Sequence, residues 1–191
     1  MSATDLALSI ALGIGLAAAV GFRVFVPMLV MSIAAASGHL TLGSGFCWLA
    51  TPAALVMLSV ATVLEILAYY IPVLDNLLDT IATPAALVAG TLVSAAVMTD
   101  VPPIVKWTTA VIAGGGAAGL TQGLTSLLRA KSTLTTAGLG NHLIATGELG
   151  GALLVSLLAL AAPLVAVGVV ALFCWFAVRV ARRLLLPRSS G

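Results

Sequence analysis

Six long apolar segments constrain the fold of this chain more than any other feature of its sequence. A helix needs about 20 apolar residues to cross roughly 30 Å of hydrocarbon. Backbone groups in hydrocarbon must also bond within their own segment, which a helix allows. The segments are residues 5–37, 52–71, 80–98, 104–130, 143–162 and 163–183. They predict an all-α, polytopic transmembrane bundle of about six helices, in which residues 1–191 form a single integral membrane domain.

Composition supports this class and excludes others. The chain is 61% hydrophobic and 7% charged, with a mean hydropathy of +1.23, whereas soluble domains carry roughly 25% charged residues. The net charge is only +2, and the few basic residues are too scattered for a nucleic-acid surface. The glycines at 114–116 lack the Gly-Lys-Ser/Thr ending of a phosphate loop. We therefore expect a lipid bilayer as the surroundings, with no nucleic acid, nucleotide or cofactor as a partner.

The first apolar segment is too long to be one straight span. Its 33 residues would make a helix of roughly 50 Å. It must therefore tilt, break near Gly21 to Pro27, or end in a re-entrant piece. Arg23 lies in this part of the segment, and we expect it to face protein or water. It could bind an anion or cap a broken helix; alternatively, it pairs with a carbonyl or snorkels outward.

Loop charges predict the orientation. If the N-terminus defines side one, the loop 129–142 and the C-terminus also lie on side one. Lys106 then lies alone on side two, and the cations on side one are Arg129, Lys131, Arg179, Arg182, Arg183 and Arg188. The positive-inside rule makes side one cytoplasmic, so both termini are expected there. If residues 24–37 form a span of their own, the N-terminus lies outside and the rest is unchanged.

Small residues spaced by four predict close helix packing and an internal repeat. Such residues share one helix face and let two backbones approach each other. We expect the first and fourth helices to cross at two triplets, Gly13, Ala17 and Gly21 with Gly115, Gly119 and Gly123. The recurrence also predicts two inverted three-helix units, residues 5–98 and 104–183, which is a construction found in many transporters. Chance recurrence in a chain rich in alanine and glycine is the alternative.

Charged residues inside apolar segments usually face the interior of a bundle and are often functional. Glu65 lies well inside the second segment. A carboxyl group in hydrocarbon favours its neutral form unless it is paired, which suits a proton-coupling or cation site. The alternative is a neutral, hydrogen-bonded glutamic acid. Straight-helix depths place Glu65 well inward of Arg23, so we do not assume that the two pair.

Further acidic residues are expected at the inner side of the bundle. Asp75 and Asp79 are four apart, so on a helix they share a face and could offer oxygens to a hard cation. They could instead cap the third helix. Glu148 lies at a similar depth in the fifth helix. We expect Asp75, Asp79, Glu148 and Glu65 to form an acidic inner vestibule. Gln122 would line a pathway in mid-membrane or bond between helices.

Several stretches together resemble one family. They are "GFRVFVP", "EILAYYIPVLDNLLDTIATPAA", "GGGAAGL", "GLGN" and "ATGELGGA". The chain resembles, over about residues 6–180, the bacterial membrane proteins grouped as domain of unknown function 4126. This resemblance implies a complete single-domain protein of the bacterial inner membrane. It implies no activity, substrate or site residues.

Three classes of function compete. The leading expectation is a small transporter or channel for an ion or small solute, alone or as a homodimer. In it, Glu65, Asp79 and Glu148 handle cations or protons, and Arg23 sets charge selectivity on the outer side. The second is a non-catalytic membrane scaffold or assembly protein. The third is an intramembrane lipid-modifying enzyme, which we rank last because the sequence offers no nucleophile–base pair. We therefore expect no enzymatic activity.

Overall fold

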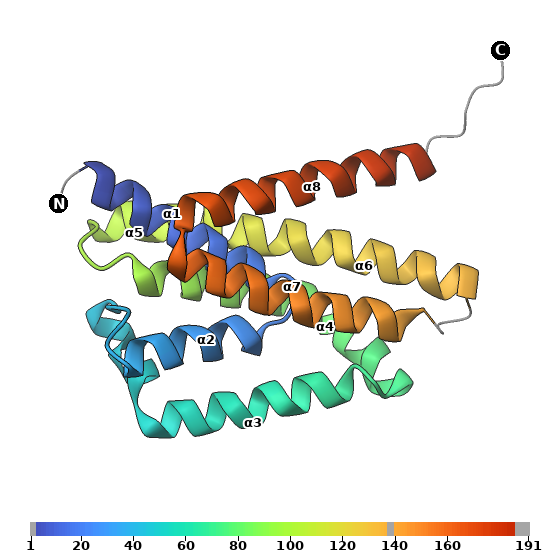
Figure 1. Cartoon of the computed structure of the whole chain (residues 1–191), viewed down its shortest axis with the longest axis horizontal. Helices are drawn as coiled ribbons and strands as arrows, with labels where there is room; N and C mark the ends of the chain where they lie inside the picture. The colour runs from blue at the N-terminus through green and yellow to red at the C-terminus, as the bar shows by residue number, and fades with distance from the viewer. Residues whose placement is uncertain (1–2, 137–139, 186–191) are drawn as a thin grey trace, which may run out of the picture.

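The computed structural model describes residues 3–136 and 140–185, and within these ranges the chain is helical with no strand (Figure 1). The α-helices are α1 (Ala3–Val20), α2 (Phe25–Ala36), α3 (Pro52–Ala68), α4 (Pro72–Val97), α5 (Pro103–Thr109), α6 (Gly116–Thr136), α7 (Asn141–Ala161) and α8 (Pro163–Leu185). A 3₁₀-helix, η1 (Ser44–Ala50), precedes α3, and a π-helix, η2 (Ala110–Gly115), joins α5 to α6. The predicted all-α class is confirmed.

Prolines define where several of these helices begin. Pro52, Pro72, Pro103 and Pro163 are each the first residue of a helix. The fixed φ of proline suits this position, and its missing N–H is not needed there. Thr51 adds a cap to α3, because its hydroxyl accepts the N–H of Ala54 at 3.3 Å. These helix starts are therefore local properties of the sequence.

The first apolar segment breaks where the sequence predicts. A turn at residues 21–24 separates α1 from α2. In Figure 1, α2 runs back toward the end of the bundle at which α1 begins, so the two form a helical hairpin. Pro27 falls in the first turn of α2, where it breaks no helical hydrogen bond. Of the three alternatives for this segment, a break followed by a returning helix is the one observed.

This hairpin bears on the expected topology. α1 begins at one end of the long axis of the molecule, and α8 ends at the opposite end (Figure 1). The expected side of the N-terminus depends on whether residues 24–37 form a span of their own. α2 is an apolar helix shorter than the candidate spans, so the side on which each terminus lies stays a prediction.

Length and apolar composition identify fewer complete spans than the six segments predicted. Among the described residues, three helices are long and apolar enough to cross a membrane: Thr80–Val97, Pro103–Thr136 and Asn141–Ala161. η1 and α3 would form a fourth as a pair bent by 69°. Thr4–Val20, Phe25–Ala36 and Pro163–Phe176 are shorter apolar helices. Side chains along α3, such as Val56, Met57 and Val60, are exposed, as expected where helices face lipid.

The predicted small-residue triplets pack differently from the expectation. A Cβ at Gly21 would collide with the carbonyl oxygen of Ala118 and with Thr121, so α1 does meet α6 there. The other contacts involve α4. In the first triplet, Gly13 lies against Ser94 and Ala17 lies near Gly90. In the second triplet, Gly115 lies against Thr91 and Gly119 against Leu87, whereas a Cβ at Gly123 would meet nothing within 4 Å. Both triplets therefore pack largely on α4. The division into units 5–98 and 104–183 falls between α4 and α5 and stays a prediction.

Candidate functional site: a buried charge cluster beside an apolar cavity

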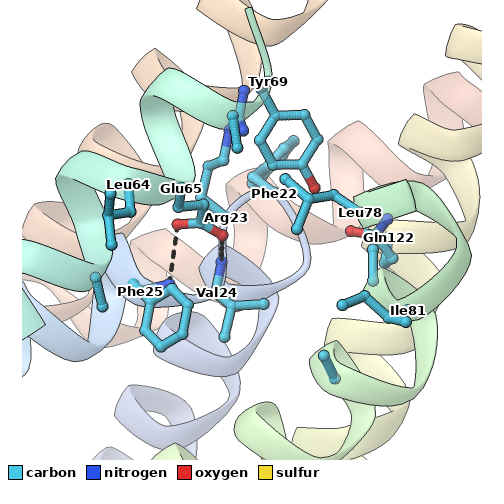
Figure 2. A pocket seen from close by; sticks show the side chains of 14 residues that line it. Phe22, Arg23, Val24, Phe25, Leu64, Glu65, Tyr69, Leu78, Ile81 and Gln122 are labelled. Carbon is cyan, nitrogen blue, oxygen red and sulfur yellow. Dashed lines mark hydrogen bonds between the residues drawn. The ribbon is translucent and has the colours of Figure 1, made fainter. Parts of the chain in front are cut away.

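The break between α1 and α2 exposes the N-terminus of α2 inside the bundle, and Glu65 of α3 occupies it. Its Oε1 accepts the N–H of Val24 at 2.8 Å, and its Oε2 accepts the N–H of Phe25 at 3.1 Å (Figure 2). Val24, the N-cap residue of α2, supplies no side-chain cap of its own. A carboxylate is stabilised there by the donors and by the helix dipole. Glu65 thus ties α3 to the hairpin through a charge-assisted cap.

The Arg23 side chain extends from the same turn in a different direction. Its side chain is buried, with only 2% of its surface exposed. Its Nη2 donates to the carbonyl oxygen of Ala145 at 3.0 Å and lies 3.7 Å from Oε2 of Glu148. Its Nε and Nη1 have no hydrogen-bond partner among the described residues. Arg23 is therefore a permanent cation whose donors are only partly used.

A second buried cation completes the arrangement. Arg129 of α6 donates from Nε to Oε1 of Glu148 at 2.9 Å and from Nη2 to Oε2. The Tyr69 ring contacts both guanidinium groups, with its centroid 3.5 Å from Cζ of Arg23 and 4.4 Å from Cζ of Arg129. Such stacking stabilises cations electrostatically. Arg23, Glu65, Arg129 and Glu148 are hereafter the four-charge cluster, whose formal charges sum to zero.

A cavity of about 430 Å³ adjoins this cluster. Its walls come from the α1–α2 turn, from α3 and α4, and from Gln122 of α6. In Figure 2 the Glu65 carboxylate stands among Leu64, Phe25 and Leu78, and the Tyr69 hydroxyl points toward Leu78. Leu64 and Ile81 line the cavity and are 60% and 52% exposed. The cavity therefore opens at the surface between α3 and α4.

Comparison with known proteins identifies the family. The family model described as Domain of unknown function (DUF4126) matches residues 10–183. The chain belongs to this family. No curated protein and no solved structure matches the chain. The turn between α1 and α2, the four-charge cluster and the cavity all lie within the matched region, so they belong to the DUF4126 domain itself.

Four of the site residues predicted from this DUF4126 sequence lie together. Arg23, Glu65 and Gln122 line the cavity, and Glu148 lies beside Arg23. The predicted separation of Glu65 from Arg23 is wrong. Depth along a straight helix does not apply to a broken one, and the turn places Glu65 against the backbone directly after Arg23.

The sequence analysis missed two residues of the cluster. Arg129 was assigned to a cytoplasmic loop, but α6 continues to Thr136 and Arg129 is buried within it. Tyr69 was not singled out as a site residue. A signal for Tyr69 was available, because residues four apart share a helix face and Tyr69 follows Glu65 at that spacing. For Arg129 the available signal was Glu148, a buried anion that needs a cation.

The expected acidic vestibule is described only in part. Asp75 and Asp79 lie in the first two turns of α4, and their side chains lie outside the described residues. The N-cap residue of α4 is Ile71, so neither aspartate holds the N-cap position. Glu65 and Glu148 are both buried, and each accepts hydrogen bonds from donor groups.

Within the described residues, no group of three His, Cys, Asp or Glu side chains could hold a metal ion.

Proposed function

We propose that the chain is a small membrane transporter or channel for an ion or small solute, with proton or cation movement at Glu65. One observation carries this proposal. The ionisable carboxyl group of Glu65 accepts hydrogen bonds from the N-terminus of α2, at the edge of an open cavity. Substrate and ion sites of many transporters are built from such interrupted helices.

The capping bonds supply a coupling mechanism. Both oxygens of Glu65 are acceptors toward α2, and such charge-assisted bonds are stronger than those of a neutral group. Protonation or a bound cation would therefore weaken the hold of α3 on α2. Because α2 is a short helix joined to α1 by a turn, it can respond by moving relative to α3. Occupancy of the site and the position of α2 are thereby linked.

Orientation follows from the positive-inside rule. The end of the bundle at which α8 finishes carries Arg179, and Lys131 lies near the end of α6. We assign this end to the cytoplasm of a bacterium and the chain to its inner membrane. The start of α1 then lies on the outer side, and the cavity is lined by residues of the cytoplasmic half of α3, such as Glu65 and Tyr69.

The test is electrometric current from purified protein in liposomes, under gradients of protons, cations and anions. The wild-type chain is compared with Glu65→Gln, which keeps the size of the side chain and removes its charge. Ser59→Ala is the matched control, because Ser59 is exposed on α3 and its hydroxyl donates to the Leu55 carbonyl of the same helix. We expect current in the wild type and in Ser59→Ala, and none in Glu65→Gln. Folded protein that gives no current under any gradient contradicts the proposal.

A scaffold or assembly role is the second candidate, and dense packing of small residues favours it. A Cβ at Gly119 would approach Cδ2 of Leu87 to 2.7 Å, so a larger residue at this position requires the Leu87 side chain to shift. A scaffold predicts that Glu65→Gln preserves function and that Gly119→Leu abolishes it. The transport proposal predicts that Glu65→Gln already abolishes function. An enzymatic role is not proposed.

A further inference from the structure

We infer that the cavity between α3 and α4 binds an amphipathic organic cation, meaning an apolar body that carries one permanent positive charge. This inference rests on the proposed function and names its class of substrate. The ligand places its charge beside Glu65 and its apolar body between α3 and α4.

The sign of the charge follows from which charged group faces the cavity. A carboxylate has about four acceptor positions, and Glu65 uses two of them on the N–H groups of Val24 and Phe25. Arg23 also lines the cavity, but its Nη2 bonds the Ala145 carbonyl and the Tyr69 ring stacks on its guanidinium group. Figure 2 shows the Arg23 side chain running toward Tyr69 and away from Phe25. Arg129 is paired with Glu148. Of the two charged residues that line the cavity, Glu65 is therefore the one that we assign to the charge of the ligand.

The walls indicate an apolar body. Three aromatic residues line the cavity, Phe22, Phe25 and Tyr69, together with Leu64, Leu78 and Ile81. Aromatic rings attract cations held within about 6 Å of their faces. A volume of about 430 Å³ lies within the usual range of small-molecule sites. A hydrated inorganic ion would leave these walls uncovered, whereas an organic cation covers them.

The opening indicates the route of entry. Leu64 of α3 and Ile81 of α4 stand at the mouth of the cavity and are exposed on an apolar surface. In a membrane, that surface faces lipid. An amphipathic cation is concentrated in the bilayer by its apolar part, so it can enter between α3 and α4 without crossing the packed centre of the bundle.

The test is equilibrium binding to the purified full chain in nonionic detergent. The probes are tetraphenylphosphonium and tetraphenylborate, which have the same four phenyl groups and opposite charges. Tetramethylammonium provides the positive charge without the large apolar body. Protein-free micelles give the background, because both large ions partition into detergent. We expect saturable binding of tetraphenylphosphonium that tetramethylammonium does not displace. Preferential binding of tetraphenylborate overturns the inference.

Two variants separate the site from the fold. Glu65→Gln removes the charge, and we expect it to weaken tetraphenylphosphonium binding by at least about tenfold, roughly the loss of one charged contact. Ala85→Phe fills the cavity from α4 and leaves Glu65 and its bonds to α2 in place, so we expect the same loss in a chain with an intact cap. Wild-type binding in both folded variants, or binding no greater than in empty micelles, overturns the inference.

Failure of this inference is distinguishable from failure of the proposed function. Glu65-dependent ion current without tetraphenylphosphonium binding removes the substrate class and leaves transport standing. Saturable binding at Glu65 without any transport in liposomes keeps the site and removes the transporter.

Discussion

The two acidic residues of the four-charge cluster are held in different ways. Glu148 meets Arg129 through both of its oxygens, and both side chains are buried between α6 and α7. Glu65 meets backbone N–H groups at the end of a helix and faces a cavity. Arg23 lies between these two acidic residues, bonded to a carbonyl and close to Glu148.

This difference separates a closed site from an open one. Glu148 is buried and its oxygens are engaged by Arg129, with Arg23 also close by, and breaking such a buried pair is costly. A carboxylate that caps a short helix beside a cavity can exchange partners, because its remaining acceptor positions are reachable. We therefore assign stability mainly to Arg129 and Glu148, and ligand chemistry mainly to Glu65.

The largest effect is expected from breaking the closed pair. Glu148→Leu leaves Arg129 buried without its carboxylate, and we expect it to lower the free energy of unfolding by about 3–5 kcal/mol. Thermal unfolding in detergent measures this. The double variant Arg129→Met/Glu148→Leu removes both charges and should recover much of the loss. Equal stability of the single variant and the wild type would show that the pair is not structural.

A smaller loss is expected from Gly21→Val, which tests the turn that creates the open site. The new side chain would collide with Ala118 and Thr121 of α6. We therefore expect the free energy of unfolding to fall by about 3 kcal/mol. Gly123→Ala is the matched control from the other predicted triplet, because its Cβ would meet nothing within 4 Å. Thermal unfolding in detergent compares the two variants. Equal losses of stability would contradict the close packing of Gly21 against α6.

Tyr69 connects the two sites, so its replacement should give an intermediate result. Tyr69→Leu removes the ring that contacts both guanidinium groups, and we expect the free energy of unfolding to fall by about 2 kcal/mol. Tyr69→Phe keeps the ring and should lose less. Unfolding of both variants by denaturant measures the difference. A larger loss for Tyr69→Phe would assign the role of Tyr69 to its hydroxyl instead of its ring.

The smallest effect on stability is expected at the open site. Glu65→Gln keeps one acceptor oxygen for the N-terminus of α2, so we expect the free energy of unfolding to fall by only about 1 kcal/mol. We expect the same variant to lose the ion current completely. Unfolding and liposome current are measured on the same preparation. A stability loss as large as that of Glu148→Leu would make Glu65 a structural residue and erase the contrast between the two sites.

The sequence by itself determined the helical class and the helix starts at proline, and it limited the first segment to a tilt, a break near Gly21 to Pro27 or a re-entrant piece, because these depend on local backbone chemistry and on the length of apolar segments. It also identified Arg23, Glu65 and Glu148, because charges in apolar segments stand out. Only the tertiary structure decided their partners. Which cation meets Glu148, and whether Glu65 meets a side chain or a helix end, depends on how each helix is rotated and on the return of α2 alongside its neighbours. Those are relations between segments far apart in the chain, and residue spacing within one segment carries no information about them.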